Sequence, residues 1–104
     1  PFSMNLKFDP VNLLCVDNID KQDEIIEKAF ELLGDDIAVV HCKDYVVEGN
    51  ELKSIAAGTG SLNYPLLLKK VKEYKPYVHC TLENTVPENA VATREFMERT
   101  YAEV

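Results

Sequence analysis

Three short apolar runs recur along the chain, separated by longer segments in which apolar residues follow a helical period. The runs cover residues 6–8, 37–42 and 77–82. Their length, their β-branched residues and the polar residues that bound them predict strands. The first run ends at Asp9-Pro10, a dipeptide that favours a turn.

The first intervening segment predicts a helix over residues 21–33. Asp20 is the expected N-cap, and Gly34 is the expected stop signal. One stripe of this helix is apolar and should face the core; its residues are Ile25, Ile26, Ala29, Phe30 and Leu33.

Two more helices are predicted after a loop over residues 45–60. One begins near Ser61, with Pro65 in its first turn, and ends at Lys75-Pro76. The other opens with Thr85 and Glu88, which match a capping box. Their apolar surfaces should consist of Leu67, Leu68, Val71 and Tyr74 in the first, and Val91, Phe96, Met97 and Tyr101 in the second.

The resulting order, β-α-β-loop-α-β-α, predicts an α/β fold. Strands that alternate with helices at intervals of about 30 to 40 residues indicate a parallel sheet with right-handed crossovers. No repeat, linker or low-complexity segment divides the chain, so residues 1–104 are expected to form part of a single domain.

Alternation of side chains along the strands places one polar residue at each strand end. Asp9, His41 and Glu83 each follow or close a predicted strand at its carboxyl end. In the second strand Ala38, Val40 and Cys42 should oppose Ile37, Val39 and His41. A sheet with one apolar and one partly polar face suits a barrel, whose active sites lie at the carboxyl ends of the strands.

Two carboxylates and one imidazole at equivalent strand ends form a candidate site for Mn²⁺, Mg²⁺, Co²⁺ or Zn²⁺. Each residue also has a purely structural alternative. Asp9 can cap the turn at Pro10, Glu83 can bond within the turn at Asn84, and His41 can be a packed strand-end residue. Cys42 next to His41 is a poor nucleophile–base pair, because adjacent strand residues point to opposite faces.

Charge and cysteine content narrow the choice of partners and compartment. The formal net charge is −7, with no cluster of Lys and Arg beyond one helix face, which argues against a nucleic-acid partner. The three cysteines have neither disulfide-framework nor zinc-finger spacing, which favours a reducing, cytoplasmic setting. No apolar run is long enough to span a membrane, and no signal peptide is recognisable.

Four segments together resemble the sugar phosphate isomerase/epimerase family, which has a xylose-isomerase-like TIM barrel. They are Asp-Pro-Val-Asn at residues 9–12, Val-His-Cys-Lys-Asp at 40–44, Gly-Thr-Gly at 58–60 and Leu-Glu-Asn at 82–84. The resemblance covers essentially the whole chain. It implies a partial TIM barrel, made of the last three of eight parallel strand–helix units.

The resemblance also implies roles for individual residues. Asp9, His41 and Glu83 match three of the four ligands of a divalent metal, and Glu83 matches one of two glutamates that exchange protons with the substrate. The metal would acidify a substrate C–H bond and stabilise an enediolate. The other glutamate belongs to an earlier strand, so the ligand set here is incomplete and we expect this chain alone to be inactive. The start at Pro1 is expected to be a cut end.

Three residues are the candidates for binding a sugar substrate: Asn12, Lys43 and Asp44. Asn12 stands where some ketose epimerases have a His. For Lys43 and Asp44 the structural alternative is a surface ion pair. The Gly58–Gly60 segment can likewise approach a phosphate or form a simple flexible turn.

Two function classes therefore remain open. The first is a fragment of a metal-dependent sugar or sugar-phosphate isomerase or epimerase, whose sheet has two open edges and one uncovered face. Such a surface favours self-association, so a homo-oligomer is expected. The second is a non-catalytic small α/β binding or interaction module, which would have no affinity for divalent metals.

Overall fold

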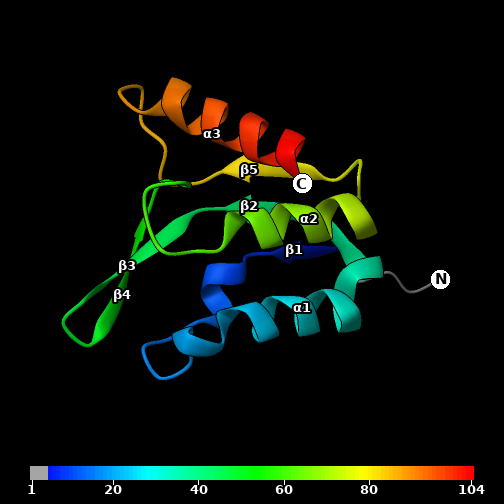
Figure 1. Cartoon of the computed structure of the whole chain (residues 1–104), viewed down its shortest axis with the longest axis horizontal. Coiled ribbons are helices and arrows are strands. Elements are labelled where there is room, and N and C mark those ends of the chain that lie inside the picture. The colour runs from blue at the N-terminus through cyan, green and yellow to red at the C-terminus, as the bar shows by residue number, and fades with distance from the viewer. Residues whose placement is uncertain (1–4) are drawn as a thin grey trace.

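The computed structural model describes residues 5–104 and has a mixed α/β fold (Figure 1). Its main sheet has three parallel strands in the order β1-β2-β5, namely β1 (Leu6–Phe8), β2 (Ile37–Cys42) and β5 (His79–Leu82). The three predicted strands and their parallel pairing are confirmed, although β5 is shorter than the run at residues 77–82. The expected cut end at Pro1 lies outside the described residues.

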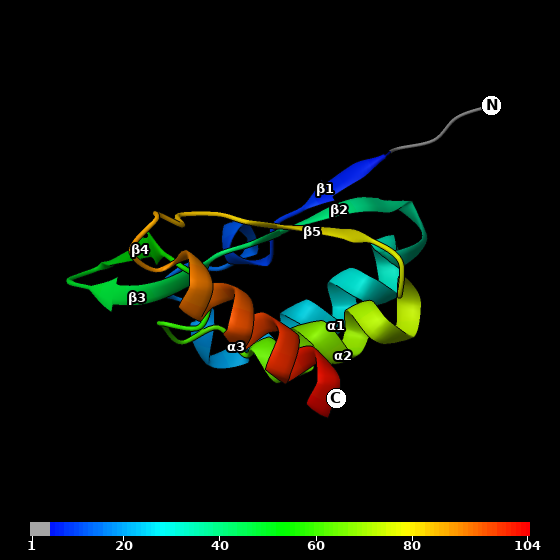
Figure 2. The same ribbon diagram turned by 90° about the horizontal axis from the view of Figure 1, so that it is seen from above.

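Three helices pack against one face of this sheet: α1 (Gln22–Leu33), α2 (Tyr64–Tyr74) and α3 (Ala90–Glu103). Figure 2 shows the strands as one layer with all three helices beneath them. No element of the described chain covers the other face of β1, β2 and β5. This one-sided packing leaves a face of mixed polarity open, on which Val39, His41 and Thr81 lie.

The core lies between the sheet and α1 and α2. The ring of Phe8 on β1 meets Phe30 of α1 edge-on at 5.2 Å, and Phe30 meets Tyr74 of α2 at 5.7 Å. The predicted apolar sides of α1 and α2 supply six of the 17 buried hydrophobic residues, namely Ile26, Ala29, Phe30, Leu67, Leu68 and Val71. In α3 the buried residues are Thr93 and Thr100, whereas Val91, expected to pack, is 69% exposed.

The expected faces of β2 are wrong at its first two residues, Ile37 and Ala38. Leu6 pairs with Ile37 but Lys7 pairs with Val39, so β2 advances two residues while β1 advances one. This irregularity puts Ile37 on the buried side with Val40 and Cys42, and leaves Ala38 exposed. From Val39 to Cys42 the side chains alternate between the two faces as predicted.

The predicted loop at residues 45–60 is also wrong in part, because it contains a hairpin. β3 (Asp44–Glu48) and β4 (Glu51–Ile55) pair antiparallel and close on the two residues Gly49 and Asn50. Gly49 has a φ of 65°, which glycine adopts without strain. Gly-Asn between two alternating segments is a hairpin signal that the sequence does carry.

Two helix starts differ from the expectation. Asp20 lies inside the 3₁₀ turn Ile19–Lys21, and Lys21 occupies the N-cap position of α1 without a side-chain cap. The capping box at Thr85 does not form, because α3 begins five residues later at Ala90. Asn89 instead accepts a hydrogen bond from Val86 N at 2.9 Å, which closes the turn before the helix.

Gly34 ends α1 as predicted, but for a different reason. Its φ is −52°, and the chain continues into a short 3₁₀ turn instead of reversing through a left-handed residue. A Cβ at this position would lie 2.8 Å from Cδ1 of Tyr74. Glycine is therefore required here by the close approach of the Tyr74 ring from α2.

The buried carboxylate of Asp44 joins the sheet to the loop that leads into α2. Its Oδ1 accepts hydrogen bonds from Tyr45 N and Leu62 N, both at 2.8 Å, and its Oδ2 accepts from Gly58 N at 3.1 Å and Gly60 N at 3.0 Å. A Cβ at Gly60 would collide with the carbonyl oxygen of Tyr45. These contacts use both oxygens of a side chain that is 1% exposed.

Replacing Asp44 with alanine should lower the free energy of unfolding by about 3 kcal/mol or more, since it leaves buried backbone donors without an acceptor. Chemical denaturation of both proteins measures the difference. Asp17→Ala, which removes an exposed carboxylate of the same type, is the matched control and should change stability by less than about 0.5 kcal/mol. Equal stability of the two variants would contradict this role for Asp44.

Candidate functional site at the carboxyl end of the sheet

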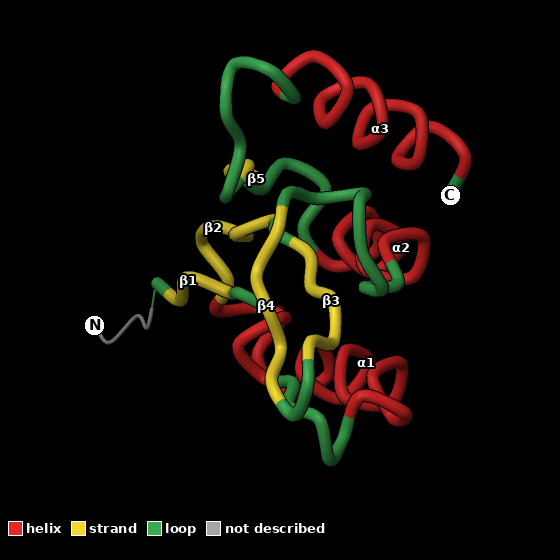
Figure 3. The backbone as a smooth tube through the Cα atoms, turned by 90° about the vertical axis from the view of Figure 1, so that its left-hand side faces the viewer, coloured by secondary structure: helices red, strands yellow, loops and turns green. Residues whose placement is uncertain are grey.

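The carboxyl ends of β1, β2 and β5 bring five of the predicted site residues together: Asp9, Asn12, His41, Lys43 and Glu83. The strands are in register there, with Phe8 opposite Val40 and Cys42 opposite Leu82. The ladder continues beyond β5, because Glu83 N donates to Cys42 O at 2.8 Å. Figure 3 shows the β3–β4 hairpin lying in front of these strand ends.

Asp9 makes two contacts at the end of β1. Its Oδ1 accepts from Val11 N at 3.1 Å and so caps the 3₁₀ turn Pro10–Leu13, which is the structural role considered above. Its Oδ2 lies 3.2 Å from Lys43 Nζ, which also donates to Asn12 Oδ1 at 3.3 Å. Both charged side chains are less than one-fifth exposed, so solvent screens this pair only partly.

His41 and Glu83 form the second pair of the site. His41 Nδ1 lies 3.0 Å from Glu83 Oε1, and the two side chains are 30% and 40% exposed. His41 lies opposite Thr81 in the ladder, on the sheet face that no helix covers, while its neighbour Cys42 is buried on the helical side. The expectation that His41 and Cys42 diverge is therefore confirmed.

Asp44 does not join this cluster. Its carboxylate is held by the backbone of residues 45–62, and it forms no surface pair with Lys43, which turns to Asp9 instead. The side chains of Lys43 and Asp44, adjacent in sequence, thus make their contacts on opposite sides of the backbone. The Gly58–Gly60 segment likewise points its N–H groups at Asp44.

Tyr64 supports the site from the helical side of the sheet, a role that the sequence did not indicate. The Tyr64 hydroxyl donates to the carbonyl oxygen of Lys43 at 2.5 Å, which holds the backbone just beyond β2. Burial raises the pKa of Tyr64 well above its usual range, and nearby Cys42 and Asp44 raise it further. Tyr64 therefore stays protonated and remains a hydrogen-bond donor.

Two of the expected metal ligands contact each other directly. The 3.0 Å between His41 Nδ1 and Glu83 Oε1 is the length of a hydrogen bond, which the two groups would have to exchange for bonds to a cation in order to bind one together. Asp9 does not complete a triad, since Lys43 holds it, and residues 5–104 contain no group of three His, Cys, Asp or Glu side chains placed to hold a metal.

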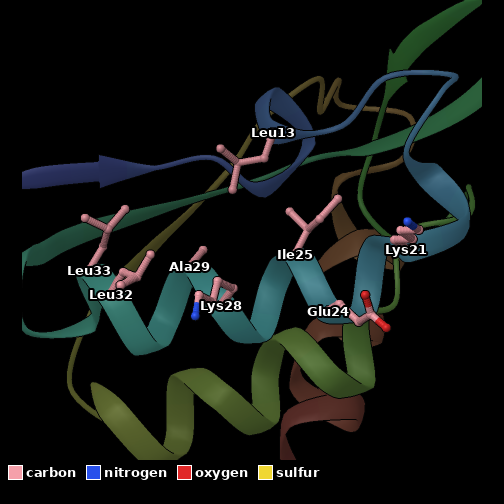
Figure 4. A pocket seen from close by; sticks show the side chains of 8 residues that line it. All are labelled: Leu13, Lys21, Glu24, Ile25, Lys28, Ala29, Leu32 and Leu33. Atoms are coloured by element: carbon pink, nitrogen blue, oxygen red, sulfur yellow. The ribbon is translucent and has the colours of Figure 1, made fainter.

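An apolar groove lies between α1 and the 3₁₀ turn that follows β1 (Figure 4). It has a volume of about 520 Å³ and is lined mainly by apolar side chains, including Leu13, Ile25, Ala29, Leu32 and Leu33. Leu13 reaches it from the 3₁₀ turn that follows β1, above the helix.

No helix within residues 5–104 combines the length and apolar character needed to cross a bilayer.

Comparison with known proteins gives no family for this chain. No protein-family model, no curated protein and no solved structure matches the chain. The fold and the geometry of the strand-end cluster therefore carry the functional argument alone.

Proposed function

We propose that this chain is part of a metal-dependent sugar or sugar-phosphate isomerase or epimerase with a TIM barrel. The three strand–helix units would be the last three of the barrel, and the uncovered face of β1, β2 and β5 would line its interior. Polar residues of the barrel then gather where such enzymes hold their active sites, at the carboxyl ends of the strands.

The observation that carries the proposal is the convergence of Asp9, Asn12, His41, Lys43 and Glu83 on one end of the sheet. These residues are up to 74 positions apart in the chain, from residue 9 to residue 83. They nevertheless make two sets of polar contacts beside three strand ends, Asp9 and Asn12 with Lys43, and His41 with Glu83. Packing alone does not require an acid, an amide, an imidazole and an amine at one such place.

The residues have complementary roles in the proposed site. A divalent cation bound there would polarise substrate oxygens and acidify the neighbouring C–H bond. Glu83, which is partly exposed, would accept or return the substrate proton, and its contact with His41 holds the carboxylate in position. Lys43 and Asn12 present an ammonium and an amide, groups that can hydrogen-bond a sugar hydroxyl or a phosphate.

Titration with Mn²⁺, followed by calorimetry, tests the cation site. The unaltered chain should bind the ion, and His41→Ala and Glu83→Gln should each weaken binding by at least about tenfold, because each removes one of two adjacent donors. Glu83→Gln keeps the shape of the side chain and so separates charge from packing. Thermal melting of each variant confirms that it folds.

His79→Ala is the control for this titration, since His79 is exposed at the opposite end of β5. It should leave the affinity unchanged. If the unaltered chain shows no affinity for Mn²⁺, Mg²⁺, Co²⁺ or Zn²⁺, or if all three variants behave alike, the proposed site is refuted.

Replacing Lys43 with methionine should raise the affinity for Mn²⁺ that the same titration measures. Methionine keeps much of the side-chain length but removes the ammonium that holds Asp9 Oδ2. Asp9 would then be available as a third ligand, and cation affinity should rise by about three- to tenfold, the size expected for release of a partly exposed ion pair. A fall in affinity would instead show that Lys43 supports the site.

A second candidate, a non-catalytic binding module, is favoured by the apolar groove on α1. The groove is lined mainly by apolar side chains and offers a surface suited to an apolar partner segment. This module requires no metal, so the Mn²⁺ titration discriminates between the two functions.

We further propose that copies of the chain associate through the uncovered face and open edges of the sheet. Light scattering on the eluting protein should give a mass above that of one chain. Thr81→Lys adds a charge to that face, opposite His41, and should shift the protein towards the monomer; Ala92→Lys adds the same charge to the exposed side of α3 and should not. A stable monomer in the unaltered protein would contradict the proposed association.

A further inference from the structure

Two free thiols lie side by side on the helical face of the sheet. Val40 pairs with Cys80 and Cys42 pairs with Leu82, so Cys42 and Cys80 occupy diagonal positions on neighbouring strands and point to the same side. Cys42 is fully buried, whereas Cys80 on the edge strand β5 is exposed. The pair is thus one inaccessible thiol beside one accessible thiol.

The diagonal placement lets the buried thiol favour the anion of the exposed one. Cys42 Sγ lies 4.0 Å from the carbonyl oxygen of Val40, and its complete burial keeps the thiol protonated, so its S–H is free to turn to a thiolate at Cys80. Consistent with this placement, the neighbouring Cys42 lowers the pKa of Cys80, against an opposing effect of partial burial. The thiolate is the nucleophilic form of a thiol.

A cavity adjoins Cys80 between β5, α2 and α3. It has a volume of about 300 Å³ and is lined by Leu68, Cys80, Met97, Glu98 and Tyr101. Apart from the carboxylate of Glu98, which is paired with Arg94 at 3.0 Å, the walls are mainly apolar. The cavity thus offers an opening beside the reactive sulfur, large enough to hold a small substituent on it.

We propose that Cys80 is a site of thiol–disulfide exchange with small disulfides, and that the adjoining cavity receives the group that is added. The Cys80 thiolate attacks one sulfur of the disulfide, whose S–S bond breaks as a new bond to Cys80 Sγ forms. The other half leaves as a thiolate and takes a proton from water. Cys80 is oxidised to the mixed disulfide and the leaving half is reduced, so no further oxidant is needed.

Cys42 acts as a positioning residue in this reaction, because it stabilises the attacking thiolate without bonding to the reagent. Cys15, which is exposed and free, is the natural internal comparison. The proposal therefore predicts an order of reactivity along a single chain: Cys80 first, Cys15 second and the buried Cys42 last.

The test uses the neutral reagent 2-hydroxyethyl disulfide on the whole folded chain, with peptide mapping by mass spectrometry at successive times. Cys80 should carry the added group several-fold sooner than Cys15, and reduction should remove it. Equal rates at the two cysteines, or modification of Cys15 ahead of Cys80, would overturn the proposal.

Variants at position 42, made in a Cys15→Ser background, test the hydrogen bond. Cys42→Ala should reduce the thiolate fraction of Cys80 about tenfold. A less acidic thiol gives a more nucleophilic thiolate, so each remaining thiolate should react about threefold faster. The expected net slowing is about threefold. Cys42→Ser, which keeps a donor of similar size, should restore most of the rate, whereas an equal rate in Cys42→Ala would refute the role of Cys42.

A pH–rate profile of the unaltered chain gives an answer even if Cys42→Ala does not fold. The groups facing Cys80 are Cys42 from β2, Tyr64 from α2, and Glu98 and Tyr101 from α3. The modification rate at Cys80 should reach half of its maximum at a lower pH than the rate at Cys15. A midpoint equal to or above that of Cys15 would overturn the proposal.

Discussion

The carboxylate of Asp44 holds together the part of the fold on which the strand ends depend. It comes two residues after the end of β2 and accepts N–H groups from its own neighbour Tyr45 and from the loop at residues 58–62. The start of α1 reinforces the same loop, since Gln22 bonds to Ser61 O and to Asn63 N. A charge buried in this way is stable only because several donors replace the water that it loses.

This constraint determines where the polar cluster can lie. Because Asp44 turns inwards to the loop, the chain leaves β2 with Lys43 on the other side, towards Asp9 and Asn12. The Tyr64 hydroxyl, held at the first turn of α2, fixes the carbonyl oxygen of Lys43 from the helical side. The buried network and the exposed cluster are thus two sides of one short segment, and a change in the first would displace the second.

The strand β2 separates two kinds of chemistry by simple alternation. His41 faces the uncovered side of the sheet, with Glu83 as its partner, and Cys42 faces the helices, with Cys80 as its partner. Cys80 lies on β5 and Glu83 directly follows it, three residues further on, so both pairs join β2 to the same neighbouring strand or its end. The covered face excludes water from one thiol, whereas the uncovered face leaves an imidazole and a carboxylate accessible. Packing helices on only one side of the sheet is what creates this difference.

Local patterns in the sequence were enough to predict the three parallel strands, the first two helices and the polar residue at each strand end. Those features depend on periodicity and on residues close together in the chain, which a linear reading can detect. The hairpin was missed although Gly49 and Asn50 signal it, because its strands are short and partly polar. The displaced start of α3 shows that a capping box is only a local preference that a turn can override.

The tertiary structure alone determined which side chains contact one another. The sequence placed Lys43 next to Asp44, but the fold pairs Lys43 with Asp9 and surrounds Asp44 with backbone donors from residues up to 18 positions away. It also brought Cys42 to Cys80 and His41 to Glu83, pairs about 40 residues apart. The sequence by itself determined the elements and their amphipathic faces. Only the register of the parallel strands determined the pairs, because register depends on the packing of whole strands and not on any local run of residues.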